Sequence, residues 1–158
     1  MKFSRKDLTP EELLHLYQQL LFPRMIEEKM LVLLRQGRIS KWFSGIGQEA
    51  IAVGATLALE EDEWIMPLHR NLGVFTSRNM PLHKLFKQWQ GSQDGYSKGR
   101  ERSFHFGSRE HYICGMISHL GPQLVVLRVR VSRLGQTRFA RPDRLRCLLG
   151  RARAIAAG

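Results

Sequence analysis

The stretch QGRISKWFSGIGQEAIAVG, residues 36–54, places three different local signals next to one another. Gly37 is the residue type that commonly ends a helix. Gly45 and Gly47 indicate a tight loop, because glycine adopts backbone angles that other residues rarely reach. The small side chains that follow, in residues 48–59, predict a helix that can lie close to its neighbours. The stretch therefore predicts the end of one helix, a tight loop and a second helix.

A long helix is expected before this stretch. Thr9 is a good N-cap, Pro10 suits the first helical position, and two acidic residues follow where they stabilise the helix dipole. Apolar residues recur at helical spacing and predict a face that packs on the core, rather than a cofactor-binding stripe. Pro23 lies inside this pattern, and we expect it to kink or split the helix.

The elements after the stretch are shorter. An apolar entry at 64–68 is followed by His69 and Arg70, and a further helix is expected from Pro81 through Trp89. Residues 91–107 contain four glycines among polar residues, which predicts a long mobile loop. Residues 111–121 are expected to form a short extended segment that ends in a glycine turn.

The charge of the chain is concentrated at one end. The 158 residues carry a net charge of +11, which is typical of proteins with a polyanionic partner. Residues 1–124 contain 16 basic and 13 acidic side chains, a net of +3, whereas residues 125–158 contain nine Arg against Asp143, a net of +8. A basic nucleic-acid-binding protein is therefore one alternative. It has weak support, because the tail has only Phe139 as an aromatic residue and no recognisable RNA-binding module.

Composition indicates a protein of the cytoplasm. The hydrophobic fraction of 43% suits one globular domain with its own core. Cys114 and Cys147 have neither disulfide-scaffold nor zinc-site spacing, which favours a reducing compartment. The amino terminus lacks the apolar segment of a secretory signal, and no apolar run is long enough to span a membrane. We therefore expect a cytoplasmic location.

Three histidine positions are candidates for chemistry. Arg70 at the end of an apolar segment could bind a phosphate in a forked geometry, and His69 could donate to the same group. An ordinary surface pair is the alternative reading of these two residues. His105 and His119 could act as acid or base groups, because imidazole titrates near neutral pH, or they could simply be packed in loops. Motifs of serine hydrolases, P-loop proteins and zinc proteases are absent from the sequence.

Five segments in order resemble one enzyme family. They are QGRISKWFSGIGQEAIAVG, MPLHRNLGVF, LFKQWQG, KGRERSFHFGS and GMISHLGPQ. Residues 8–124 resemble the amino-terminal part of the alpha subunit of 2-oxoacid dehydrogenases, the thiamine-diphosphate-dependent, decarboxylating first component. The segment GMISHLGPQ is more similar to the branched-chain type than to the pyruvate type.

The resemblance implies a fold, a reaction and a set of contacts. The fold is α/β, the amino-terminal portion of a thiamine-diphosphate-binding fold with a parallel sheet flanked by helices. The reaction is oxidative decarboxylation of a 2-oxoacid, with acyl transfer to a lipoyl carrier. A beta subunit and a lipoyl-bearing second component are the implied protein partners in a hetero-oligomer. Cofactor contacts map to His69, Arg70, Ser118 and Leu120, and no catalytic residue is assigned.

The resemblance ends near Leu124. The family continues with GDG and NN motifs that hold Mg²⁺ on the cofactor diphosphate, and neither motif occurs in this sequence. We therefore expect two regions: 1–124, a partial thiamine-diphosphate-binding dehydrogenase domain, and 125–158, an Arg-rich tail foreign to the family. A reading-frame shift in a GC-rich gene would produce such a tail, and the truncated chain would then be inactive alone. A nonfunctional remnant is the third alternative.

Overall fold

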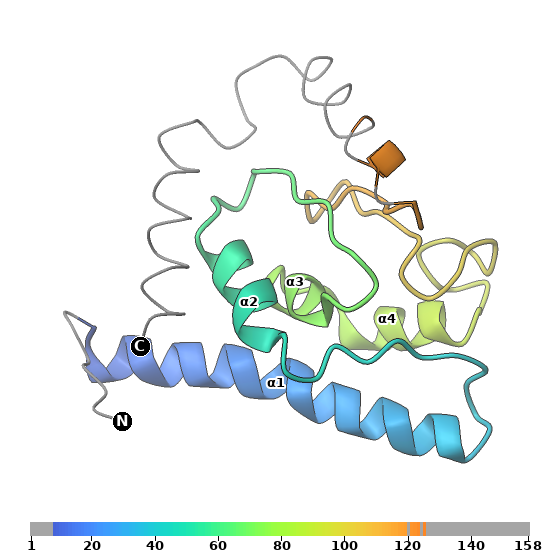
Figure 1. Ribbon diagram of the computed structural model, residues 1–158, viewed down its shortest axis with the longest axis horizontal. Helices are drawn as coiled ribbons and strands as arrows, with labels where there is room; N and C mark the ends of the chain where they lie inside the picture. Colours follow the sequence, from blue (N-terminus) through green and yellow to red (C-terminus); the bar gives the residue numbers. More distant parts are fainter. Residues whose placement is uncertain (1–7, 120, 124, 126–158) are drawn as a thin grey trace.

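A computed structural model describes residues 8–119, 121–123 and 125 of the chain. In that part, four helices follow one another: α1 (Pro10–Arg35), α2 (Glu49–Leu57), α3 (Leu72–Ser77) and α4 (Leu82–Trp89). Figure 1 shows α1 as a long rod along one side of the molecule, with the three shorter helices above it. Leu120, Cys147 and the tail from residue 126 onward lie outside the described residues.

The expected first helix and its cap are confirmed. Thr9 and Glu12 form a capping box: the Thr9 hydroxyl accepts from the Glu12 amide at 3.2 Å, and the Thr9 amide donates to the Glu12 carboxylate at 2.8 Å. Of the kink or split expected at Pro23, the split was wrong, because α1 runs unbroken from Pro10 to Arg35; the kink stays a prediction. A proline in a helix removes only one amide donor. Pro23 is buried, and with Glu49 and Ala52 of α2 it lines a shared cavity, so packing holds the helix together.

α2 and α3 pack against each other at very close range. A Cβ at Gly73 would lie 2.9 Å from a methyl group of Val53 and 3.0 Å from Cβ of Ala52. The small-residue helix expected at 48–59 is confirmed as α2, and its small side chains permit this approach. α3 was not expected from the sequence. Residues 72–76 are all buried, so the segment has no alternation of apolar and polar side chains to indicate a helix.

The core between these helices contains a cluster of aromatic rings among aliphatic side chains. Trp42 lies with its ring centroid 5.1 Å from those of both Trp89 and Phe104, and Phe75 lies 5.7 Å from Phe104 and 5.2 Å from Phe106. Trp89 belongs to α4, which confirms the helix expected at 81–89. The aromatic rings join α3, α4 and the loop around residue 105 into one core.

The long loop at 91–107 is tied to α4 by one buried amide. The side-chain oxygen of Gln88 accepts from the backbone amide of Ser97 at 2.8 Å and from its hydroxyl at 2.9 Å. The side-chain nitrogen of Gln88 donates to the carbonyl of Arg102 at 3.3 Å. The loop therefore leaves α4 and returns to it before it reaches His105.

The segment at 64–68 pairs with residue 113 over a single bridge. The Ile65 amide donates to the Tyr112 carbonyl and the Cys114 amide donates to the Ile65 carbonyl, both at 2.9 Å, which is a parallel pattern. An antiparallel bridge joins Ser108 to Ile113. These isolated bridges are the only β pairing among the described residues, so the parallel sheet stays a prediction. No helix in this same part of the chain is long and apolar enough to cross a membrane.

Candidate functional site

His69 and Arg70 lie at the tip of a turn just before α3. The Leu68 amide donates to the side-chain oxygen of Asn71 at 2.8 Å, and the Asn71 amide donates to the Leu68 carbonyl at 3.1 Å. An Asn side chain that bonds nearby backbone in this way stabilises a turn. The turn therefore fixes the two predicted phosphate-binding residues relative to the buried helix α3.

Two histidines and a serine from three distant segments meet beside this turn. The His69 ring lies between Phe43 and His105, with centroid distances of 4.9 Å and 5.0 Å. His105 Nε2 is 2.6 Å from the Ser118 hydroxyl. The structure therefore brings together two positions that the resemblance assigned, His69 and Ser118. His105 contacts both of them. From the sequence, His105 was either an acid or base group or a histidine simply packed in a loop.

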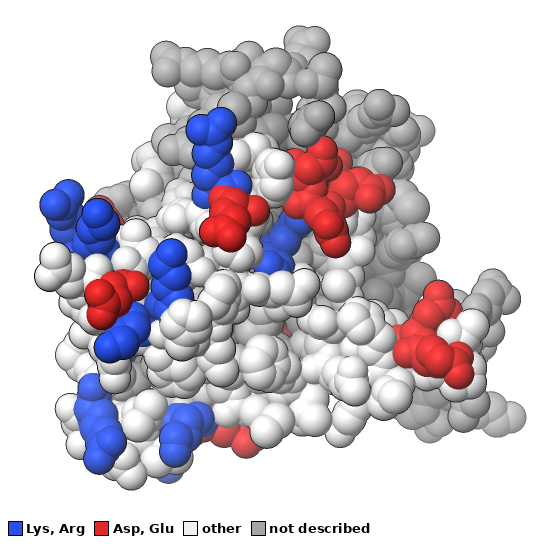
Figure 2. Space-filling model, turned by 180° about the vertical axis from the view of Figure 1, so that it is seen from behind, with Lys and Arg blue, Asp and Glu red and all other residues white. Residues whose placement is uncertain are grey.

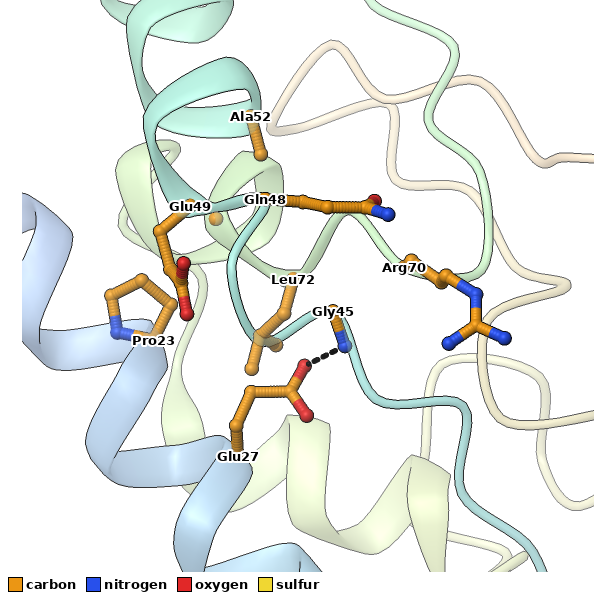
Figure 3. Close-up of a pocket in the computed structure, with 9 residues that line it drawn as sticks. Pro23, Glu27, Gly45, Gln48, Glu49, Ala52, Arg70 and Leu72 are labelled. Atoms are coloured by element: carbon orange, nitrogen blue, oxygen red, sulfur yellow. Dashed lines mark hydrogen bonds between the residues drawn. The ribbon is translucent and has the colours of Figure 1, made fainter.

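Arg70 is held by the loop at 42–47. Its Nη1 donates to the Ser44 carbonyl at 2.5 Å. A Cβ at Gly45 would overlap the carbonyl oxygen of Arg70, so only glycine permits the two backbones to lie so close. Arg70 is otherwise exposed and, with Gly45 and Gln48, lines a small cavity. Figure 3 shows its guanidinium directed away from Gln48 and Glu49.

The loop at 42–47 is in turn anchored to α1 by a buried carboxylate. Glu27 is 1% exposed. It accepts from the Trp42 indole nitrogen at 2.7 Å and from the Gly45 amide at 3.0 Å, the second bond being drawn in Figure 3. Glu27 was not predicted from the sequence. A signal existed, because helical spacing puts position 27 on the same face as the buried Pro23 and Met30.

A second carboxylate fixes the other end of that loop. Glu49 accepts from Arg24 Nε at 2.6 Å and from the Gly47 amide at 2.9 Å. The bond from Arg24 lowers the pKa of Glu49, and the bond to Gly47 acts in the same direction. Two carboxylates thus join α1 and α2 to the backbone that positions Arg70.

The surroundings of both histidines of the site favour the neutral form of the ring. The pKa of His69 is lowered by burial first, then by His105, Arg70 and Arg102. The pKa of His105 is lowered by burial and then by Arg102, with Glu101 acting in the opposite direction. A neutral imidazole has one N–H donor and one acceptor nitrogen. His105 Nδ1 is buried and has no hydrogen-bond partner within the described residues, so this atom can bond to a ligand or a water molecule.

Gln123 connects the turn after Ser118 to the segment before His69. Its amide donates to the His119 carbonyl at 3.0 Å, and its side-chain nitrogen lies 3.4 Å from the Pro67 carbonyl. The side-chain oxygen of Gln123 is buried without a hydrogen-bond partner in the described part of the chain. Leu120, the fourth predicted contact, is outside the described residues.

The arrangement suits binding of a phosphate group better than nucleophilic catalysis. A serine beside a histidine can act as a nucleophile when a third group orients the imidazole. Within the described residues, no such group bonds to Nδ1 of His105. A guanidinium, hydroxyl and imidazole N–H groups are instead the donors that bind phosphate oxygens. In the same part of the chain, no group of three or more His, Cys, Asp or Glu residues is placed to hold a metal ion.

Comparison with known proteins gives a consistent set of relatives. The family model described as "Dehydrogenase E1 component" matches residues 17–138. The alpha subunit of 2-oxoisovalerate dehydrogenase from Dictyostelium discoideum is 32% identical over 125 residues, 77% of this chain and 28% of that protein. The pyruvate dehydrogenase E1 component subunit alpha of Mycoplasma genitalium is 34% identical over 88 residues, 56% of this chain and 25% of that protein. The chain spans only about a quarter of the length of these relatives.

Proposed function

This chain belongs to the dehydrogenase E1 component family, and we propose that it is the amino-terminal part of a 2-oxoacid dehydrogenase alpha subunit. The observation that carries this proposal is the meeting of His69, His105 and Ser118 beside Arg70. These residues come from three separate segments, and each segment belongs to the pattern that resembles the family.

The residues present fit the diphosphate of thiamine diphosphate. Arg70 supplies a cation and further N–H donors at the exposed end of a fixed turn. The His105 ring, which lies against His69, and the Ser118 hydroxyl that contacts it add polar groups near the same turn. Thiamine diphosphate, when bound, supplies the carbon nucleophile that permits a 2-oxoacid to lose carbon dioxide. The role of this chain is to bind and orient the diphosphate.

The neutral state of the histidines matches this role. Burial lowers the pKa of both rings, so Arg70 provides the fixed positive charge and the rings provide directed hydrogen bonds. The Ser44 carbonyl orients Arg70 while leaving the rest of its guanidinium exposed. Because Glu27 holds the adjacent Gly45 amide, α1 contributes to the binding geometry without itself contacting the ligand.

Substrate and partners follow from the relatives. Several of these are named for 2-oxoisovalerate, a branched-chain 2-oxoacid, and one is named for pyruvate. We extend the branched-chain class to this chain, with a beta subunit and a lipoyl-bearing second component as protein partners. In the family Mg²⁺ accompanies the cofactor, but the described residues contain no group placed to hold it. A cytoplasmic location is also part of the proposal.

Calorimetry with the whole chain tests the cofactor proposal. We expect thiamine diphosphate with Mg²⁺ to bind, unphosphorylated thiamine to bind much more weakly, and inorganic diphosphate to compete. Loss of a hydrogen bond to a charged group costs about 1.5–3 kcal/mol, so Arg70→Gln should weaken binding roughly 10- to 150-fold. Arg38→Gln, at another exposed arginine, is the matched control. Equal affinity of both variants, or no heat at millimolar cofactor, would refute this role for Arg70.

The boundary near Leu124 is a separate proposal. We propose that residues 125–158 result from a reading-frame shift, since their only basic residue type is arginine. The family match extends to residue 138, so the coding DNA between codons 124 and 138 is the place to test it. An alternate frame that encodes a small-residue helix followed by GDG supports the shift. The absence of that frame would disprove it.

A further inference from the structure

The helix α1 has apolar side chains on two opposite faces. One face carries the buried residues Pro23, Ile26 and Met30, which pack on the rest of the molecule. The other face carries a row of exposed apolar side chains, each 38–59% exposed. We call this row the outer stripe; its members are Leu14, Tyr17, Leu21, Met25 and Val32. Phe22 of α1 is also exposed but lies about 80° around the helix from Leu14, outside the row.

The spacing of the outer stripe is that of a helix–helix contact. With 3.6 residues per turn, Leu14, Leu21, Met25 and Val32 lie within about 40° of one another around the helix axis. Their successive separations of about seven, four and seven residues are those of a coiled coil. Tyr17 lies at one edge of the row. An exposed apolar row of this regularity indicates a protein contact.

The order of residues along the stripe identifies the partner. We propose that the outer stripe binds the same stripe of a second copy of this chain, with the two α1 helices antiparallel and related by a twofold axis near Pro23. In this arrangement Leu14 faces the partner's Val32, and Leu21 faces the partner's Met25. Twofold symmetry repeats each pair, so four apolar layers form from one set of residues.

The polar positions on the same face support this register. Position 18 faces position 28 of the second copy, which places the Gln18 amide opposite the partner's Glu28 carboxylate. Position 11 faces position 35, which places Glu11 opposite the partner's Arg35. All four side chains are exposed. The sequence of α1 is therefore complementary to itself when reversed, in charge as well as in apolar character.

A parallel pairing of the same helices lacks this complementarity. Glu11 would face Glu11, Glu28 would face Glu28, and Arg35 would face Arg35, which places like charges together at three layers. The acidic first turn and basic last turn of α1 also favour antiparallel pairing. Figure 2, in which the molecule is seen from behind, shows acidic side chains at one end of its lower edge and basic ones at the other.

Sedimentation velocity of the whole chain tests the proposal. We expect a concentration-dependent monomer–dimer equilibrium, because one helix pair is at the small end of protein interfaces. The double variant Leu21→Glu, Met25→Glu should raise the dimer dissociation constant at least tenfold. Ile51→Glu, at an exposed apolar residue of α2, is the matched control and should leave the constant unchanged. Helical content from circular dichroism identifies any variant that fails to fold.

Charge exchange tests the antiparallel register. Glu11→Arg alone and Arg35→Glu alone should each weaken the dimer by about fivefold, since each creates two like-charged pairs. The combined exchange Glu11→Arg, Arg35→Glu should restore the original constant to within about twofold. A dimer without this restoration would overturn the register.

Three other outcomes would overturn the proposal. The first is a chain that stays monomeric at every concentration, and the second is an Ile51→Glu variant that weakens the dimer as much as the double variant does. The third is a chain shortened after residue 125 that dimerises where the full chain does not, which would mean that the tail covers the stripe. None of these results depends on thiamine diphosphate, so failure here is distinguishable from failure of the proposed function.

Discussion

Replacement of Glu27 is the most direct test of how the fold supports the site. Its carboxylate is 1% exposed and accepts from two buried donors, the indole N–H of Trp42 and the amide of Gly45. Glu27→Ala leaves both donors without a partner. Each unsatisfied buried donor costs about 1–3 kcal/mol. Because the substitution also removes a buried charge, which is favourable, we expect a net loss of about 3 kcal/mol in the free energy of unfolding.

Glu27→Gln separates the hydrogen bonds from the shape of the side chain. The amide oxygen keeps one of the two bonds, while the amide NH₂ group faces the second donor, so we expect a loss of about 1–2 kcal/mol. Glu28→Ala is the matched control, because the neighbouring residue is exposed and its replacement should cost less than about 0.5 kcal/mol.

Urea unfolding of the three variants, followed by circular dichroism at low micromolar protein, measures these differences. The order of stability should be Glu28→Ala, then Glu27→Gln, then Glu27→Ala. Both Glu27 variants should also bind thiamine diphosphate more weakly, since the Gly45 loop positions Arg70. Equal stability of all three variants would show that the two hydrogen bonds do not anchor the loop.

Three further predictions concern the site and its supports. Gly45→Ala places a Cβ on the carbonyl oxygen of Arg70 and should lower the free energy of unfolding in urea by about 1–3 kcal/mol. Gly47→Ala is the control: the space around it is open, so its loss of unfolding free energy should come only from the strain of a positive φ. Because the pKa values of His69 and His105 lie below the ordinary 6.5 in the folded state, the unfolded chain binds more protons as the pH falls through 6.5. The free energy of unfolding should therefore decrease as the pH is lowered from 7.5 to 5.5, and His105→Gln should make this decrease smaller. If His105→Gln left the pH dependence unchanged, His105 would not be its cause. Thr9→Ala should lower the unfolding free energy by about 1 kcal/mol through loss of the capping box, and a smaller helical signal near the amino end should accompany it.

The helices that carry their own signals could be predicted from the sequence. α1 begins at Pro10 because Thr9 and Glu12 form a local cap, and α2 follows from its run of small residues. α3 could not be predicted, because a six-residue helix buried on all sides shows no periodicity. The unbroken course of α1 through Pro23 depends on packing with α2, which local propensity does not contain.

The site was predictable in part. Family-like motifs pointed to His69, Arg70 and Ser118 as cofactor contacts, which stays a prediction, and their proximity depends on how distant segments pack. His105 lies 36 positions after His69, and only the folded chain places its ring between His69 and Ser118. Glu27 was not predicted for a different reason. A carboxylate among apolar residues of a helix interrupts the apolar pattern, and its role becomes clear only from the two buried donors that it bonds.

The single parallel bridge between Ile65 and Ile113 has a consequence for the time course of folding. Its residues are 48 positions apart, and closing a loop of that length costs roughly 3.4 kcal/mol of chain entropy, beyond a constant term. Local helices can form in microseconds, before so distant a pair meets. During synthesis, His69 cannot contact His105 until His105 and the segment at 113 have left the ribosome. The cluster of His69, His105 and Ser118 is therefore among the last of the described parts to assemble, and a newly made chain passes through a stage in which α1 is complete while this cluster has not yet formed.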